Sequence, residues 1–168
     1  MKLKRKEIIT FLSFIEFLKY SKEKKDEKIE NAIAEAEIEG SVSEDIANYY
    51  GRRYVENEFK SYSNSYLKAS ALKHLGLDID IVGKSLKLCA CPCCGYKTLL
   101  GKCEYLICEV CYWEDDGSSL GNANKYSSPN RMTLNNARTN FEKFGVIAIE
   151  FLKCAEEDRM FRFEKPQI

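Results

Sequence analysis

The sequence predicts an α+β protein with a helical unit in residues 1–78 and a smaller cysteine-rich unit in residues 79–168. Apolar residues recur at helical spacing through much of the first part, which favours packed helices. The second part contains two Cys-x-x-Cys pairs and, later, a capped helical pattern. These features predict a small β-hairpin domain with C-terminal helices. A chain of 168 residues is long enough for two small units that each bury a core.

The first unit begins with a densely apolar segment, Ile8–Leu18. Its apolar residues are too dense for a one-sided stripe, so this helix is expected to be well buried. The segment is too short to span a bilayer. Glu16 interrupts it, and no small-residue cleavage site precedes the charged run Lys22–Lys28, so it does not fit a secretory signal. We therefore expect a cytoplasmic protein with no membrane partner.

Two further helices are expected before the cysteine-rich unit. One is predicted over Asp26–Glu37. Ser41 and Glu44 then have the form of a capping box, in which each side chain accepts a hydrogen bond from the other residue's backbone amide. A longer helix is predicted over Arg53–Leu75, because residues such as Val55, Phe59 and Tyr62 recur at helical spacing and Gly76 is a natural stop. The Asn and Ser residues of segment 61–65 favour a break within it.

The most informative feature of the second unit is a matched pair of motifs, Cys91/Cys94 and Cys108/Cys111, with thirteen residues between them. In each motif one tight turn can aim two thiolates at the same ion, and two such turns complete a tetrahedron of sulfur. Zn²⁺ prefers this arrangement in structural sites, and iron in a rubredoxin-like centre is the alternative. We expect one structural zinc ion per chain. The only histidine, His74, is interpreted as structural because the four thiolates already close the site.

Disulfide bonds are the other use that eight cysteines could have in a chain of this size. Without a secretory signal the compartment is expected to be reducing, and paired cysteines there act more often as metal ligands. The segments Tyr96–Leu100 and Cys103–Ile107 are joined by a Gly-Lys turn. They are predicted to form the two strands of a hairpin between the cysteine pairs, which would make a zinc ribbon.

Two helices are expected after the cysteine pairs. Thr133 is predicted to cap a helix that runs through Phe144, because its hydroxyl can accept a hydrogen bond from the first turn and Gly145 is a natural stop. The apolar segment Val146–Met160 is expected to form a final helix on the core.

Three segments carry a family resemblance. They are Cys91–Leu99, which begins Cys-Pro-Cys-Cys-Gly, then Ile107–Gly117, and then Asn130, Leu134, Ala137, Arg138, Asn140, Phe141, Phe144 and Gly145 around the predicted C-terminal helix. Together they resemble the bacterial cysteine-rich CPCC family over roughly residues 88–145. The resemblance implies a zinc-binding domain and no defined activity. Many members carry proline where this chain has Glu109. Proline would stiffen the second turn, so this difference affects the expected rigidity of the turn and not metal ligation.

Cys93 is the extra thiol within the first motif. It is a candidate reactive thiol, or a ligand in a shifted register. A small residue tolerated in a tight turn is the interpretation we favour, because reactivity needs a lowered pKa and access. Cys89, Cys103 and Cys154 are expected to be ordinary buried thiols, although Cys89 and Cys103 lie near enough to the hairpin to substitute as ligands. Four sulfur ligands leave zinc no open position for water, so metal-activated hydrolysis is not expected.

An acidic segment follows the second cysteine pair and consists of Trp113, Glu114, Asp115 and Asp116. It is a candidate partner-binding surface, because tryptophan is enriched at interface hot spots and the acids would suit a basic protein. The same acids could bind a second cation or accept a proton. The alternative is that Trp113 packs over the metal site while the acids cap the following turn.

Three classes of function follow from these features. The leading expectation is a non-enzymatic, zinc-binding protein-interaction module, such as an immunity or antitoxin-like partner of a bacterial toxin, because residues 30–45 and 104–116 are acidic. A nucleic-acid-binding zinc ribbon would use the lysine-rich N-terminus with Tyr62 and Tyr66, although a net charge of zero gives no general reason for it. A thiol-redox or hydrolytic enzyme is the least favoured, since no familiar catalytic motif is present.

Overall fold

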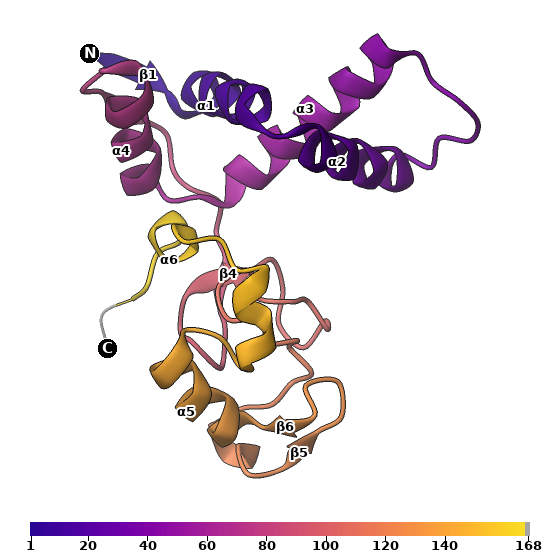
Figure 1. Ribbon diagram of the computed structural model, residues 1–168. Coiled ribbons are helices and arrows are strands. Elements are labelled where there is room, and N and C mark those ends of the chain that lie inside the picture. The colour runs from indigo at the N-terminus through magenta and orange to yellow at the C-terminus, as the bar shows by residue number, and fades with distance from the viewer. Residues whose placement is uncertain (167–168) are drawn as a thin grey trace. The chain divides into compact units, whose positions relative to one another are not determined.

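The computed structural model describes residues 1–166 (Figure 1). Its two compact units, the first ending at Leu86 and the second beginning at Lys87, contain helices and short strand pairs, which confirms the predicted α+β class. The structure places the boundary between the units later than the predicted one after residue 78. Residues 79–86 belong to the first unit, because β2 (Asp80–Val82) pairs in parallel with β1 (Lys2–Lys4).

Four helices form most of the first unit: α1 (Arg5–Lys19), α2 (Lys22–Glu35), α3 (Glu44–Ser61) and α4 (Asn64–Leu75). The gap between α3 and α4 confirms the predicted break. Ser63 caps α4, since its hydroxyl accepts a hydrogen bond from the Tyr66 amide at 3.1 Å. Gly76 ends α4 in the left-handed conformation, at φ 67°, as predicted.

The predicted starts of α2 and α3 were wrong. α2 begins at Lys22 and not at Asp26, because Ser21 provides its N-cap and accepts a hydrogen bond from the Lys24 amide. α3 begins at Glu44 and its N-cap is Ser43, so the expected capping box led by Ser41 does not form. The helix therefore starts well before Arg53, the residue from which it was predicted.

Gly51 shows how packing supports the longer α3. It lies in the middle of the helix, where glycine lowers helix propensity. A Cβ atom at this position would lie 2.7 Å from Cγ1 of Ile29 in α2 and 2.9 Å from Cε2 of Phe17 in α1. The missing side chain thus lets three helices approach one another, and their packing outweighs the propensity cost.

The expected burial of the first helix holds for one of its faces. One face of α1, which includes Ile8 and Leu12, is buried, and its main helix contacts are with α3 and α4. The other face leaves Phe11, Phe14 and Leu18 exposed by 58%, 43% and 57%. α2 packs mainly on α3, so this apolar face stays open within the unit.

His74 lies in the last turn of α4, in the first unit and not among the clustered thiols. Its Nδ1 atom is 2.8 Å from Nζ of Lys19. Burial lowers the pKa of the His74 imidazole, and the charges of Lys19 and Lys73 lower it further. The contact with Lys19 makes His74 part of the packing of α4 against α1.

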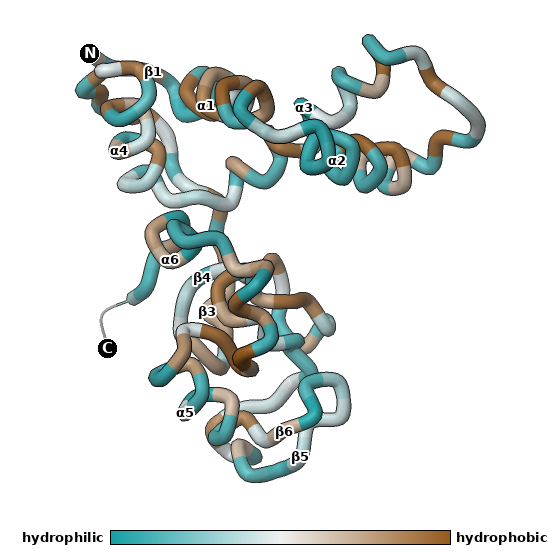
Figure 2. The backbone as a smooth tube through the Cα atoms, in the orientation of Figure 1, coloured by the Kyte–Doolittle hydropathy of each residue, from teal (hydrophilic) through white to brown (hydrophobic). Residues whose placement is uncertain are grey.

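The second unit has short elements: β3 (Cys89–Ala90), β4 (Lys97–Leu99), η1 (Leu120–Asn122), β5 (Tyr126–Ser127), β6 (Met132–Thr133), α5 (Leu134–Phe144), η2 (Ile149–Lys153) and α6 (Arg159–Arg162). The Thr133 hydroxyl accepts from the Asn136 amide at 3.1 Å, and Gly145 ends α5 at φ 73°. Both ends of the predicted α5 are therefore confirmed. In Figure 2 the backbone around β3 and β4 is mostly brown, for apolar residues, whereas β5 and β6 are paler or teal.

Two expectations for this unit were wrong. β4 pairs with β3 and not with Cys103–Ile107, because Cys103 and Tyr105 have left-handed backbone conformations (φ 59° and 58°) that a strand does not allow. The segment Val146–Met160 is not one helix and contains only the 3₁₀ turn η2 and the start of α6. In residues 1–166, no helix is long and apolar enough to cross a membrane.

Candidate metal centre

The first cysteine pair sits at the tip of the β3–β4 hairpin. The Cys91 amide donates to the carbonyl of Tyr96 at 2.8 Å, and the Gly95 amide donates to the carbonyl of Cys91 at 3.0 Å. Gly95 has φ 79°, a left-handed conformation that glycine adopts without steric cost. These bonds close a tight knuckle that points Cys91 and Cys94 in the same direction.

The second pair forms the same knuckle with different residues. The Cys108 amide donates to the carbonyl of Trp113, and the Tyr112 amide donates to the carbonyl of Cys108, both at 2.9 Å. An isolated bridge between Ile107 and Glu114 replaces the strand pair of the first knuckle. Tyr112 has φ 68° at the position that Gly95 occupies in the first knuckle. For a residue with a side chain this conformation costs roughly 1–2 kcal/mol.

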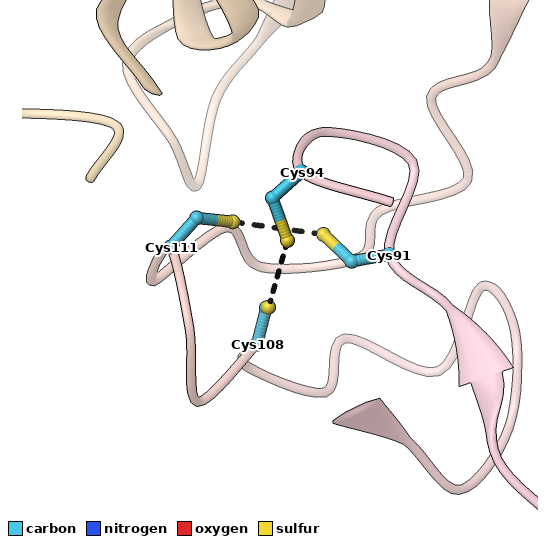
Figure 3. Close-up of side chains that lie close together, drawn as sticks. All are labelled: Cys91, Cys94, Cys108 and Cys111. Carbon is cyan, nitrogen blue, oxygen red and sulfur yellow. Dashed lines mark hydrogen bonds between the residues drawn. The ribbon is translucent and has the colours of Figure 1, made fainter. Parts of the chain in front are cut away.

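The two knuckles bring four sulfur atoms together (Figure 3). The Sγ atoms of Cys91 and Cys111 are 3.6 Å apart, as are those of Cys94 and Cys108, and all four lie within 4.8 Å of one another. A tetrahedron with Zn–S bonds of 2.3 Å has sulfur atoms about 3.8 Å apart. All four cysteines are buried. The site therefore has the donor set, spacing and enclosure of a metal centre with four thiolate ligands.

The polar surroundings favour a thiolate at one ligand in particular. Burial acts to raise the pKa of Cys108, but hydrogen bonds from the other three thiols and from the Thr98 hydroxyl (3.1 Å) hold it well below its ordinary value. Burial raises the pKa of Cys111, and hydrogen bonds with the neighbouring thiols raise it further. The four buried thiols lie close together with their protons. A cation that displaces these protons would bind all four sulfur atoms as thiolates.

Residues 89–160 match the model of the family described as Cysteine-rich CPCC. This confirms the resemblance seen in the sequence and extends it beyond Gly145. All four clustered thiols lie within this CPCC segment, whereas the helical unit lies outside it. No curated protein and no solved structure matches the chain.

Two arginines of the CPCC segment hold the backbone of the knuckles. Arg138 of α5 donates through Nε and a terminal nitrogen to the carbonyl of Pro92, at 3.1 and 2.7 Å. Arg159 of α6, which is only 9% exposed, donates to the carbonyls of Val110 and Gly145, each at 3.0 Å. Arg138 formed part of the family resemblance, but sequence reasoning missed Arg159, whose buried position has no local signal in the sequence.

The other cysteines of the CPCC segment differ in exposure. Cys93 is buried beside Cys111, with which it is hydrogen-bonded, so access to it as a reactive thiol is restricted in this structure. Cys89 is half-buried. Cys103 and Cys154 are exposed, so the expectation that these two are buried thiols was wrong. None of the four belongs to the sulfur cluster.

The acidic segment after the second knuckle is mostly turned inward. Trp113 is fully buried, and Asp115 is 4% exposed and accepts a hydrogen bond from the Cys103 amide at 2.8 Å. Both positions fit the alternative weighed from the sequence, in which this segment packs beside the metal site. Asp116 caps a turn by accepting from the Ser118 amide at 3.0 Å. Glu114 is half-buried, so Glu114 and Asp116 remain the accessible part of the segment.

Asn130 fixes the backbone of Glu114, a role that sequence reasoning did not assign. Its Oδ1 accepts from the Glu114 amide and its Nδ2 donates to the Glu114 carbonyl, both at 2.8 Å. The same Nδ2 also donates to the Ser127 hydroxyl at 2.8 Å. The turn after β5 is thereby tied to the second knuckle, and the backbone of Glu114 is held in a defined place.

Proposed function

We propose that the chain is a non-enzymatic binding protein whose CPCC segment folds around one structural zinc ion. The observation that carries the proposal is the buried cluster of four sulfur atoms from Cys91, Cys94, Cys108 and Cys111. With four protein thiolates the coordination of zinc is complete, so no position is left for a substrate or a catalytic water. The ion then has a structural task.

The sparse secondary structure of the second unit supports a structural task for the ion. Its strands are only two or three residues long, and α6 has four residues. Such short elements provide few backbone hydrogen bonds to hold the unit together. A zinc ion joins the hairpin that carries Cys91 and Cys94 to the loop that carries Cys108 and Cys111, and its binding energy becomes folding energy.

A protein partner is the proposed ligand of the folded unit. Glu104 and Glu109 are exposed and Glu114 and Asp116 are half-buried, so the region of residues 104–116 presents acidic groups without a basic residue. This surface suits a basic protein, as an immunity or antitoxin-like partner of a toxin would need. We propose a cytoplasmic site of action, because a reducing compartment keeps the four clustered thiols available as metal ligands.

Nucleic acid is a weaker candidate for the partner. Tyr62, one of the two tyrosines expected to stack on bases, is buried between Phe59 and Tyr66. Among the N-terminal lysines, Lys28 forms an ion pair with Glu58 at 2.7 Å. Tyr62 and Lys28 are therefore engaged within the protein, whereas a nucleic-acid-binding surface needs exposed rings and available positive charges.

Metal analysis of protein purified without added metal tests the structural site. One zinc per chain by elemental analysis and native mass is expected, with loss of the metal in Cys91→Ser and Cys108→Ser variants. Cys154→Ser is the matched control, because this exposed thiol lies outside the cluster. One iron atom in place of zinc would identify a rubredoxin-like centre, and metal-free protein with disulfides would refute the proposal.

Capture experiments test the partner. The zinc-loaded chain is expected to retain a basic protein from a lysate of its own source, and charge reversal at Glu104 and Glu109 should weaken retention. Recovery of nucleic acid alone, with binding that falls steeply as salt rises, would favour the alternative.

A further inference from the structure

A cavity of about 470 Å³ lies beside the second knuckle, within the CPCC segment. It is formed by residues on both sides of the knuckle, by the turn between β5 and β6, and by the start of η2. The lining that matters here consists of Tyr112, Glu114, Arg131, Ile147, Glu150 and Phe151. Its volume lies in the range of pockets that hold small ligands or protein side chains.

Two aromatic rings line the cavity. Tyr112 and Phe151 stack with their planes 3° apart and their centroids 5.1 Å apart. The Tyr112 hydroxyl donates to the carbonyl of Cys154 at 3.1 Å, which fixes the orientation of the tyrosine ring. The faces of aromatic rings attract cations and pack well against alkyl chains.

The backbone conformation at the cavity is an observation independent of the stacked rings. Tyr112 and Arg131 are two of the few non-glycine residues with left-handed backbone conformations, at φ 68° and 55°, and both line this cavity. In the first knuckle the equivalent position is Gly95, which adopts the conformation without strain. Strained residues of this kind concentrate at ligand-binding sites.

Two carboxylates complete the lining. The side chains of Glu114 and Glu150 have no hydrogen-bond or ion-pair partner within residues 1–166. Arg131 is exposed at the same cavity, and its guanidinium is likewise unpaired in the described part of the chain. The three groups sum to one negative charge, and Asn130 already holds the backbone of Glu114 in place.

We propose that this cavity binds an arginine side chain of a protein partner. The proposal rests on the proposed binding function and deepens it by naming the group that is recognised. The guanidinium pairs with Glu114 and Glu150 and its plane lies against an aromatic ring, an arrangement that suits arginine better than lysine. The alkyl stem packs against Ile147, and Arg131 donates to a main-chain carbonyl of the bound segment.

A peptide titration of the zinc-loaded, full-length chain tests the proposal. The probe is an end-blocked Gly-Gly-Arg-Gly-Gly peptide, and the control is the same peptide with citrulline, a neutral isostere of arginine. Nuclear magnetic resonance of ¹⁵N-labelled protein should show shifts at the amides of Tyr112, Glu114 and Phe151. The citrulline peptide should bind at least several-fold more weakly, because it keeps the shape and loses the charge.

Variants locate the interaction. The double variant E114Q/E150Q should lower the affinity for the arginine peptide about tenfold, since charge-assisted hydrogen bonds become neutral ones. E142Q is the matched control, because Glu142 is an exposed acid on α5 outside the cavity, and its affinity should equal that of the wild type. Raised salt should weaken binding of the arginine peptide and leave the citrulline peptide unaffected.

Three outcomes would overturn the proposal. One is the absence of shifts at about 10 mM peptide, where even a Kd of about 1 mM gives nearly full occupancy. Another is equal binding of the arginine and citrulline peptides, and the third is unchanged binding by E114Q/E150Q. The zinc content of every sample is measured in parallel. Loss of zinc with retained peptide binding would contradict the structural metal site and leave the cavity proposal standing.

Discussion

Replacing Arg159 by methionine should destabilise the cysteine-rich unit by about 3 kcal/mol, because three backbone carbonyls lose a charged donor. The guanidinium donates to Val110 at 3.0 Å, to Gly145 at 3.0 Å and to Glu156 at 2.9 Å. The bond to Val110 is buried and the other two are partly buried. Methionine has a similar length and keeps much of the apolar contact, so the loss reports mainly on the hydrogen bonds.

The magnitude follows from the burial of each acceptor. A buried hydrogen bond to a charged group contributes about 1.5–3 kcal/mol, and partly buried ones contribute roughly 0.5–1 kcal/mol each. Val110 lies inside the second knuckle, so its carbonyl also fixes the approach of Cys108 and Cys111. Mutation of a residue that orients metal ligands typically lowers the metal affinity by about 10- to 100-fold. We therefore expect zinc to transfer to a competing chelator correspondingly more readily.

The assays are urea unfolding followed by fluorescence of Trp113, the only tryptophan, and zinc competition with a chromogenic chelator. Arg131→Met serves as the control, because Arg131 is exposed and makes no side-chain hydrogen bond within the described residues. Arg159→Lys should fall between the wild type and Arg159→Met, since one ammonium group cannot reach three carbonyls in a fork. Unfolding free energies of Arg159→Met and Arg131→Met that agree within about 0.5 kcal/mol would refute the reasoning.

Three further predictions concern the two units separately. Gly51→Ala should destabilise the helical unit by about 1–2 kcal/mol in thermal unfolding, despite its higher helix propensity, because the new methyl group would meet Ile29 and Phe17; a stabilised variant would contradict the packing argument. The lowered pKa of His74 means that the unfolded chain binds the proton more tightly, so stability should fall as pH drops through about 6.5, and His74→Gln should abolish this dependence in pH-resolved denaturation. Removal of zinc by a chelator should shift the fluorescence of Trp113 to the red while most helical circular dichroism persists, since α1–α4 lie in the other unit; parallel loss of both signals would show that the units unfold together.

Local patterns in the sequence predicted the parts whose geometry is set over a few residues. The Cys91/Cys94 and Cys108/Cys111 spacing places two sulfurs on one turn whatever the rest of the chain does, and the structure joins the two turns into one cluster. Thr133 and the glycine after Phe144 defined α5 for the same reason, because capping depends on backbone groups within one helical turn.

Predictions failed where distant packing decided the outcome. The part of α3 before Arg53 was not predicted, and its Gly51 packs where Ile29 and Phe17 fill the space that a side chain would occupy. The apolar density of Ile8–Leu18 did not reveal that α3 and α4 cover only part of α1. For Trp113 the sequence left an interface role and packing beside the metal site equally open, and the structure shows a fully buried side chain.

The sequence by itself determined the thiol set of the candidate metal centre, the capped C-terminal helix and the division into a helical and a cysteine-rich part, because short-range spacing and capping are encoded residue by residue. Only the tertiary structure decided that β4 pairs across the first knuckle, that Arg159 holds Val110, and that Tyr112, Glu114 and Glu150 share a cavity. Those contacts join residues that are distant in the chain. Their formation depends on which surfaces meet when the whole unit packs, and no local pattern carries that information.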